Sequence, residues 1–346
     1  MVIFVFIIAE IGYRLYKEGF PDAFIHLIKN WRTPYSDFGT NNLFIYDEEL
    51  GYRLNPERPD INELSIRSND FSVKKPEGVY RMACLGDSLL YAFKGKIYEG
   101  NSVDNPSIRM LVEVINAATP GYTTYQELIF LKKYLLQVSP DVVILNYCLN
   151  DNHRFLHRFK GDMIWTDEAQ ESLAINNLFD KIVSRSYVLS RIKLFLVSKK
   201  AAKSKSKFPW EDDIGFNTAW KDYSWVDIDR YLGEMSRLLN ERGIHLCVVV
   251  YPIKLQFKEK LLDSHYDYVL KPQRKMRDIC DGYKIPVLDL FPYFYEAYRK
   301  GVKLFRPDGL HLTNEALRLV EKSLFSFLEK EEDYLPIKIN AENSHF

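Results

Sequence analysis

Short apolar runs recur between residues 80 and 290, and each ends at a turn residue or a polar residue. An apolar run without alternation is typical of a strand that is covered on both faces, as in a parallel sheet. The pattern therefore predicts a parallel sheet with helices on both faces. The expected strands are 80–85, 112–117, 141–148, 244–251 and 286–290.

Segments with apolar residues at helical spacing separate these runs. One begins at Thr124, where Glu127 completes a capping-box pattern, and another begins at Ser224 with Asp227 in the same position. Strands that alternate with helices predict βαβ units. The apolar faces of the last two helices are Ile228, Tyr231, Leu232, Met235, Leu238 and Leu239, and then Leu317, Val320, Leu324 and Leu328.

Two parts of the chain do not follow this rhythm. Residues 21–77 form an arm rich in turn residues, and residues 152–223 form an insertion between the third and fourth strands. The insertion contains KKAAKSKSK at 199–207, which is typical of a solvated loop, with contact to an anionic surface as the alternative. The expected divisions are a possible truncated membrane anchor (1–20), an arm (21–77), the main domain (78–330) and a tail (331–346).

The chain begins with an unbroken apolar run from Val2 to Ala9. The run is too short to span a bilayer, which needs about 20 apolar residues. It also lacks a preceding basic region and a small-residue cleavage site. Three interpretations stay open: a truncated or mis-started membrane anchor, a core or interfacial helix, and a degenerate signal peptide.

The composition is that of a globular protein, with 47% apolar and 27% charged residues. Lysine plus arginine equals aspartate plus glutamate at 47 each, which argues against nucleic acid as a bulk electrostatic partner. Aromatic residues make up 14%, which indicates packing, with a surface that faces sugar or lipid as the alternative. No CxxC pair is present, which argues against a zinc site or a thioredoxin-like motif. Three of the four cysteines lie in apolar strand-like runs, so they are expected to be small buried hydrophobes: Cys84, Cys148, Cys247 and Cys280.

Candidate catalytic and binding residues follow the ends of the predicted strands. Asp87 and Ser88 follow the first strand, Gly121 follows the second, and Asn150 follows the third. Ligands of an open parallel sheet bind beyond the carboxyl ends of its strands, so these residues are expected at one edge. After the fifth strand and a further helix, the chain adds Asp308 and His311.

These residue types are those that acyl transfer through a serine requires. The Ser88 hydroxyl needs a base, and the His311 imidazole titrates near neutral pH. Asp308, three residues before His311, can accept the other ring N–H and fix the tautomer. The N–H groups of Ser88 and Gly121 and the Asn150 amide can donate to a tetrahedral oxyanion. Each motif alone is more often an ordinary turn, but together, in this order, they indicate a serine esterase.

The chain resembles the SGNH/GDSL hydrolases, which carry four sequence blocks. RMACLGDSLL resembles the first, with Ser88 as nucleophile, and INAATPGYTTYQE resembles the second, with Gly121 as an oxyanion donor. NYCLND resembles the third, with Asn150 as another donor, and PDGLHLTNEA resembles the last, with Asp308 and His311. The resemblance covers about residues 78–328, outside the insertion.

The resemblance implies a flavodoxin-like three-layer α/β/α sandwich with a five-stranded parallel sheet in the order 2-1-3-4-5. It also implies ester hydrolysis through an acyl-serine, without a metal or other cofactor, on an acyl (expected O-acetyl) ester of a carbohydrate or lipid. The arm, through Asp47–Pro56 and the turn at Asn69–Phe71, resembles membrane-anchored bacterial members found with surface-polysaccharide genes. Membrane association with an extracytoplasmic catalytic domain is therefore expected, with a cytoplasmic location as the alternative.

The chain departs from the family pattern near the nucleophile and in the third block. Leu89, Leu90 and Ala92 stand where small or hydroxyl residues and glycine are common, and Cys148 replaces a usual glycine. Two other functions therefore stay open: an O-acyltransferase that modifies a surface polysaccharide, and a non-catalytic binding protein with the same fold.

Four basic residues past Asn150 have a spacing that suggests other roles. His153 and His157 lie four apart, as do Arg154 and Arg158. A metal pair lacks a third ligand and the glutamate of HExxH, so no metal is expected. A basic rim that faces an anionic substrate is one alternative, and a solvated helix face is the favoured one. No GxSxG elbow is present, which argues against the ordinary α/β-hydrolase fold.

Overall fold

The structure is a computed structural model, and the sheet and its connecting helices lie within the residues that it describes. The predicted N-terminal run falls largely outside these residues, as do most of the insertion and nearly all of the tail. The described residues are 8–12, 43–47, 49–67, 71–91, 111–152, 155–159, 162–166, 207–211, 213, 215–307 and 309–331.

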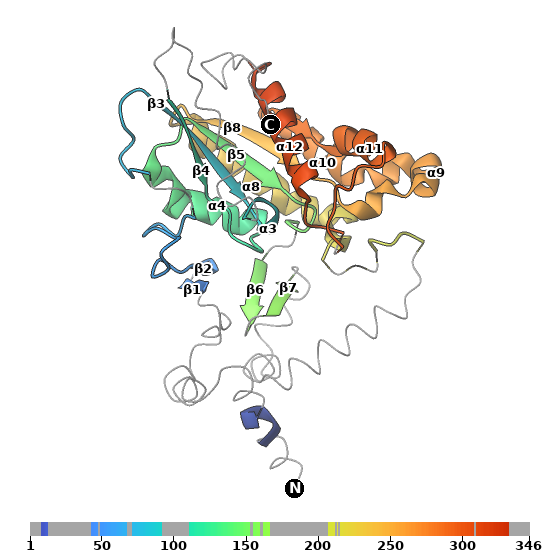
Figure 1. The fold of residues 1–346 in the computed structure, drawn as a ribbon, viewed down its shortest axis with the longest axis horizontal. Helices are drawn as coiled ribbons and strands as arrows, with labels where there is room; N and C mark the ends of the chain where they lie inside the picture. The colour runs from blue at the N-terminus through green and yellow to red at the C-terminus, as the bar shows by residue number, and fades with distance from the viewer. Residues whose placement is uncertain are drawn as a thin grey trace.

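The central sheet has five parallel strands in the order β4-β3-β5-β8-β9 (Figure 1). Counted along the chain within this sheet, the order is 2-1-3-4-5, so the predicted topology is confirmed. The five predicted runs match the observed strands to within two residues. The strands are β3 (Val79–Gly86), β4 (Leu111–Asn116), β5 (Val142–Tyr147), β8 (His245–Val250) and β9 (Val287–Asp289).

Helices cover both faces of this sheet. The connections from β4 to β9 all advance in one direction, and right-handed crossovers place their helices on one face. In agreement, α4 packs against α8 and α8 packs against α10, whereas α12 lies over the opposite face (Figure 1). The helices are α3 (Ser88–Tyr91), α4 (Thr124–Lys133), α8 (Asp222–Asn240), α9 (Glu259–Val269), α10 (Lys271–Tyr283), α11 (Phe291–Arg299) and α12 (Asn314–Leu328). Short 3-10 turns lie at η2 (Leu135–Val138), η3 (Asn217–Trp220) and η4 (Lys254–Phe257).

The strands are apolar because both of their faces are covered. All six side chains of β5 are buried, as are the last five of β8. The four cysteines are also buried and free, which confirms the prediction that they behave as small hydrophobes. Burial of this apolar surface is the main force that holds the helices to the sheet.

Helix α4 begins at Thr124, as predicted, but its capping pair lies one residue earlier than predicted. Helix α4 has Thr123 as its N-cap, and the capping partner is Gln126, which accepts the Thr123 N–H over 3.2 Å, rather than Glu127. A tertiary contact supports this register, because the Gln126 amide also donates to the carbonyl of Leu50 over 2.7 Å. Helix α8 begins at Asp222, so Ser224 lies inside it, where its hydroxyl donates to the Thr218 carbonyl.

The arm and the insertion each contribute a small antiparallel hairpin. Strands β1 (Phe44–Asp47) and β2 (Gly51–Leu54) pair in the arm. Strands β6 (Phe155–Phe159) and β7 (Asp162–Thr166) pair in the insertion. The prediction of a solvated helix face was therefore wrong at His157 and Arg158, because both residues lie in β6, which pairs with β7. His153 and Arg154 lie outside the described residues.

Within the described ranges, no helix is both long enough and apolar enough to cross a bilayer.

Candidate active site

Ser88 lies at the start of α3, directly beyond the carboxyl end of β3. Gly86 makes this turn possible, because a Cβ there would lie 3.1 Å from the Leu90 Cβ and 3.2 Å from the Asn146 Cβ. Asp87 then caps the helix, with its Oδ1 accepting the Leu89 N–H over 2.8 Å. Ser88 is left half-buried at the edge of the sheet where ligands of this fold class bind.

His311 is carried by the loop before α12. An antiparallel bridge joins Phe305 to Leu312, and the N–H of Arg306 donates to the His311 carbonyl over 2.7 Å. The Arg306 side chain adds a bond from Nε to the Leu312 carbonyl at 3.0 Å. This loop places Nε2 of His311 3.2 Å from Oγ of Ser88, although the two residues are 223 positions apart in sequence. The structure thus brings together the predicted nucleophile and the predicted base.

Asp308, the predicted partner of His311, lies outside the described residues. Its role as the group that orients the imidazole stays a prediction. Its neighbour Gly309 is described, with a φ of 76°, and its carbonyl accepts the N–H of Lys254 over 3.2 Å. The loop that carries Asp308 and His311 is therefore tied to the 3-10 turn η4 that follows β8.

Asn150 lies in a tight turn after β5. The N–H of Asp151 donates to the Cys148 carbonyl over 2.9 Å, and the Cys148 N–H donates to Oδ2 of Asp151 over 2.7 Å. The buried Asn150 side chain donates from Nδ2 to Oδ2 of Asp87 over 3.1 Å. Asn150 is thereby held beside the residue that precedes Ser88.

Gly121 lies in the loop after β4, which we call the oxyanion loop (Thr119–Tyr122). The N–H of Thr119 donates to the Gly86 carbonyl over 3.0 Å, which ties this loop to the end of β3. The N–H of Tyr122 closes the loop on the Thr119 carbonyl at 3.1 Å. Gly121 has a φ of 78°, in the left-handed region that favours glycine. The three predicted oxyanion donors therefore follow three adjacent strands of the sheet: β3, β4 and β5.

Three carboxyl groups close to the site are fully buried: Asp87, Glu127 and Asp151. Burial raises the pKa of Asp87, although bonds from the Leu89 N–H and the Asn150 amide act to lower it. The pKa of Glu127 is raised well above its usual range, mainly by burial and further by the charge of Asp87. The pKa of Asp151 is also raised well above its usual range, mainly by burial and further by the charge of Glu127. Within the described part of the chain, neither oxygen of Glu127 has a hydrogen-bond partner. This arrangement favours the protonated form of Glu127.

The sequence motifs had indicated no role for these acids in the site. Asp87 and Asp151 each lie next to a predicted site residue, and that adjacency was the available signal. Glu127 was assigned to a helix cap instead.

The structure accounts in part for the residues that depart from the family pattern, since Leu89, Leu90 and Cys148 are all buried. They fill the core beneath the site, whereas Ala92 lies outside the described residues.

Among the residues with described positions, no three His, Cys, Asp or Glu side chains lie close enough to hold a metal ion.

Solved structures similar to this chain include several esterases. A lipase/acylhydrolase from Enterococcus faecalis is 13% identical, with 71% of this chain and 93% of that chain covered and a TM-score of 0.41. An acetyl xylan esterase is 14% identical, with 71% and 98% covered and a TM-score of 0.44. A two-domain esterase active on acetylated mannans is 12% identical, with 75% and 51% covered and a TM-score of 0.40.

A search of curated proteins finds no match to this chain. A protein family, in contrast, matches residues 84–319, which is more than half of the chain and includes all the predicted site residues. The match begins within β3, the first strand of the central sheet along the chain, and ends within α12, the helix that carries the chain past the last strand. The chain therefore belongs to the GDSL-like lipase/acylhydrolase family, and it is an ester hydrolase.

Proposed function

We propose that this enzyme removes an acyl group from a carbohydrate or lipid ester by a two-step serine mechanism, and that this group is O-acetyl. The observation that carries the proposal is the distance of 3.2 Å between Nε2 of His311 and Oγ of Ser88. This is hydrogen-bonding distance, which a nucleophile and its general base need. Family membership supports the same chemistry.

In the first step, Oγ of Ser88 attacks the ester carbonyl carbon while His311 takes the hydroxyl proton. The negative charge that develops on the carbonyl oxygen is stabilised by N–H donors, for which we propose Ser88, Gly121 and Asn150. The C–O bond to the alcohol then breaks, and the proton on His311 passes to the leaving alcohol. The acyl group is left on Ser88.

In the second step, a water molecule attacks the acyl-serine. His311 takes a proton from this water, the same donors stabilise the second oxyanion, and Ser88 leaves with the proton from His311. The products are the free acid and the regenerated enzyme. Asp308 is proposed to accept the other ring N–H of His311 in both steps, which fixes the tautomer that this proton transfer needs.

The substrate class is supported by the resemblance of the arm. Asp47–Pro56 resembles the corresponding segment of membrane-anchored bacterial members found with surface-polysaccharide genes. The same resemblance and the apolar run Val2–Ala9 support membrane association, with the catalytic domain outside the cytoplasm. Fractionation tests the location, and recovery of the full-length chain in the soluble cytoplasm would count against it.

The activity is tested with a chromogenic acetyl ester, with and without an oligosaccharide acceptor. Hydrolysis should release one acetate for each chromophore, and intact mass should show an acetylated Ser88 that is missing from Ser88→Ala. Faster chromophore release with the acceptor, together with an acetylated oligosaccharide, would instead identify an acyltransferase. An acetylated surface polysaccharide offered as the natural substrate should lose acetate under the same conditions.

A further inference from the structure

The arm hairpin (β1 and β2) contacts the oxyanion loop through a pair of buried tyrosines. The hydroxyl of Tyr52 donates to the carbonyl of Pro120 over 3.0 Å. In return, the hydroxyl of Tyr122 donates to the carbonyl of Tyr52 over 2.8 Å. The two rings lie 5.4 Å apart, and neither is more than 1% exposed. Gly121 lies between the two loop residues that this exchange holds.

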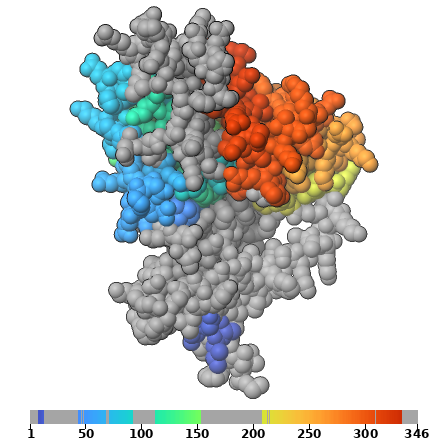
Figure 2. Space-filling model, in the orientation of Figure 1, coloured from blue at the N-terminus to red at the C-terminus, as the bar shows by residue number. Residues whose placement is uncertain are grey.

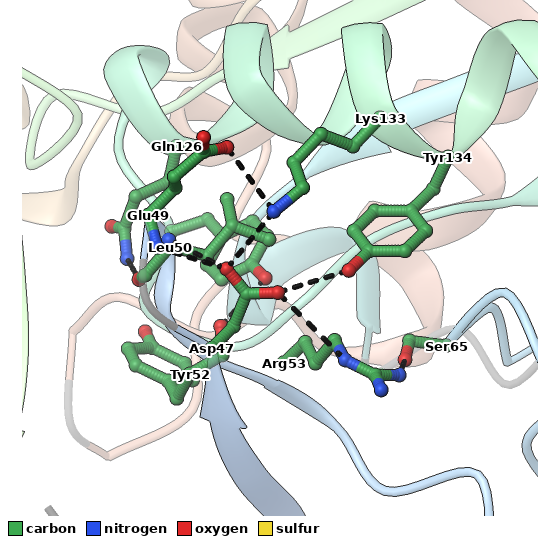
Figure 3. A network of polar contacts seen from close by, with 10 residues as sticks. Asp47, Glu49, Leu50, Tyr52, Arg53, Ser65, Gln126, Lys133 and Tyr134 are labelled. Atoms are coloured by element: carbon green, nitrogen blue, oxygen red, sulfur yellow. Dashed lines mark hydrogen bonds and ion pairs between the residues drawn. The ribbon is translucent and has the colours of Figure 1, made fainter.

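The hairpin is itself held firmly against α4 (Figure 3). Oδ2 of Asp47 accepts the Tyr134 hydroxyl over 2.9 Å, and Nζ of Lys133 lies 3.5 Å from Oδ1. Burial acts to raise the pKa of Asp47, but bonds from the Leu50 N–H and the Tyr134 hydroxyl outweigh it and lower this pKa. A carboxylate that stays charged at neutral pH therefore fixes the hairpin to the helix that follows the oxyanion loop.

The loop needs such support because its donor residue is a glycine. Glycine has the greatest conformational freedom of any residue, and Gly121 adopts a φ of 78°. An oxyanion donor is effective only when it is oriented before the reaction, and a misplacement of about 1 Å can cost roughly 100-fold in rate. The backbone hydrogen bonds of the loop join Thr119 to Tyr122 and to Gly86 at the end of β3. They do not include the carbonyl of Pro120, which Tyr52 engages.

We propose that the arm hairpin holds the oxyanion loop in its catalytic conformation, with Tyr52 as a positioning residue for the N–H of Gly121. This inference rests on the proposed function, in which Gly121 is an oxyanion donor. Tyr52 acts through the Pro120 carbonyl and does not touch the substrate. The arm therefore supports the active site from outside it, although the family match begins 32 residues after Tyr52, at residue 84.

The test compares Tyr52→Phe with Tyr134→Phe. Each variant loses one buried or part-buried hydroxyl from the same interface between the hairpin and the rest of the domain, but only Tyr52 bonds the loop. For Tyr52→Phe, kcat on an aryl acetate should fall about 10-fold with KM within about two-fold, since one misaligned donor weakens the transition state alone. Tyr134→Phe should keep kcat within about two-fold of the wild type, because Lys133 and Gln126 still bond the hairpin to α4 and the bond from Tyr52 to the loop is intact. Equal kcat values for Tyr52→Phe and the wild type would overturn the proposal.

Hydrogen–deuterium exchange supplies a readout that needs no turnover. A peptide that contains Gly121 should exchange faster in Tyr52→Phe than in the wild type, and at the wild-type rate in Tyr134→Phe. Unchanged exchange in Tyr52→Phe would overturn the proposal even if the wild type hydrolyses no ester, an outcome that separately removes the proposed function. If Tyr52→Phe does not fold, Tyr122→Phe removes the reciprocal bond, and the same two measurements decide.

Discussion

The side-chain amide of Asn150 donates a hydrogen bond to Oδ2 of Asp87 over 3.1 Å, and Oδ1 of the same carboxylate accepts the Leu89 N–H over 2.8 Å. One buried carboxylate thus caps the helix that begins at Ser88 and orients the amide that we propose as an oxyanion donor. An amide nitrogen carries two hydrogens, so the bond to Asp87 leaves one for the substrate oxygen. The turn after β3 and the turn after β5 are coupled through this contact.

Loss of the Asn150 amide should therefore lower the rate of the chemical step. For Asn150→Ala, we expect kcat to fall by roughly 10²–10³ as one oxyanion donor disappears. KM should change little, since this donor acts mainly on the charged transition state. Steady-state kinetics on a short-chain aryl ester, with circular dichroism as the folding control, measures this. A kcat within two-fold of the wild type would remove Asn150 from the oxyanion site.

Ser88→Ala should abolish ester turnover without unfolding the protein, because the Ser88 hydroxyl is the proposed nucleophile and the residue is only half-buried. His311→Ala should be nearly as damaging, since the serine then keeps its proton. The double variant should be little worse than either single one, because members of a triad act as a unit. Asp308→Ala should be the most forgiving of these changes. Wild-type rates for Ser88→Ala and His311→Ala would mean that the serine mechanism is wrong.

Glu127 should make the enzyme less stable as the pH rises. Burial raises the pKa of Glu127 in the folded state, so the unfolded chain binds fewer protons there above its own pKa of about 4.3. The stabilisation that the protonated form provides is complete below that pH and is lost as the pH rises through the folded pKa. In Glu127→Gln, the free energy of unfolding should therefore fall less between pH 5.5 and pH 8 than in the wild type.

Urea denaturation at both pH values measures this difference. Glu315→Gln, at the exposed start of α12, is the matched control. Its carboxylate has a lowered pKa, mainly through a backbone hydrogen bond, and is ionised at both pH values, so the pH slope should stay as in the wild type. A wild-type slope in Glu127→Gln as well would show that Glu127 does not stay protonated in the folded state.

Arg81 should contribute to stability and not to catalysis. Its side chain is fully buried near the amino end of β3, where it bonds Glu113 over 2.6 Å and the Ser72 carbonyl over 2.8 Å. Arg81→Met leaves these acceptors without their donor and should cost about 3 kcal/mol of unfolding free energy. Lys75→Met, which breaks the more exposed ion pair with Asp141, should cost less than about 1 kcal/mol.

Chemical denaturation compares the two variants, and kcat of the folded enzyme should be unchanged in both. A loss of kcat in Arg81→Met at temperatures where it is fully folded would contradict a purely structural role. Equal losses of stability in the two variants would show that burial of the guanidinium adds nothing to its ion pair.

The amino-acid sequence determined the sheet and the strand ends that carry the chemistry. The run at 141–148 is largely apolar, and its length is typical of a strand covered on both faces, a local property that is visible without a structure. The order of the strands also depended on the family resemblance. The residues at the strand ends, Ser88, Gly121 and Asn150, could be found because parallel strands place their carboxyl ends at one edge.

Only the tertiary structure decided the contacts between distant segments. The register of α4 is supported by the bond from Gln126 to Leu50, and a local capping pattern had assigned the partner to Glu127 instead. Likewise, no periodicity indicates that Tyr52 reaches Pro120 across 68 positions. Hydrophobic periodicity shows which face of a helix or strand is apolar, and therefore which positions are expected to face the core. Which buried polar groups meet depends on how whole elements pack, and this is why the support of the site by the arm became visible only in the folded molecule.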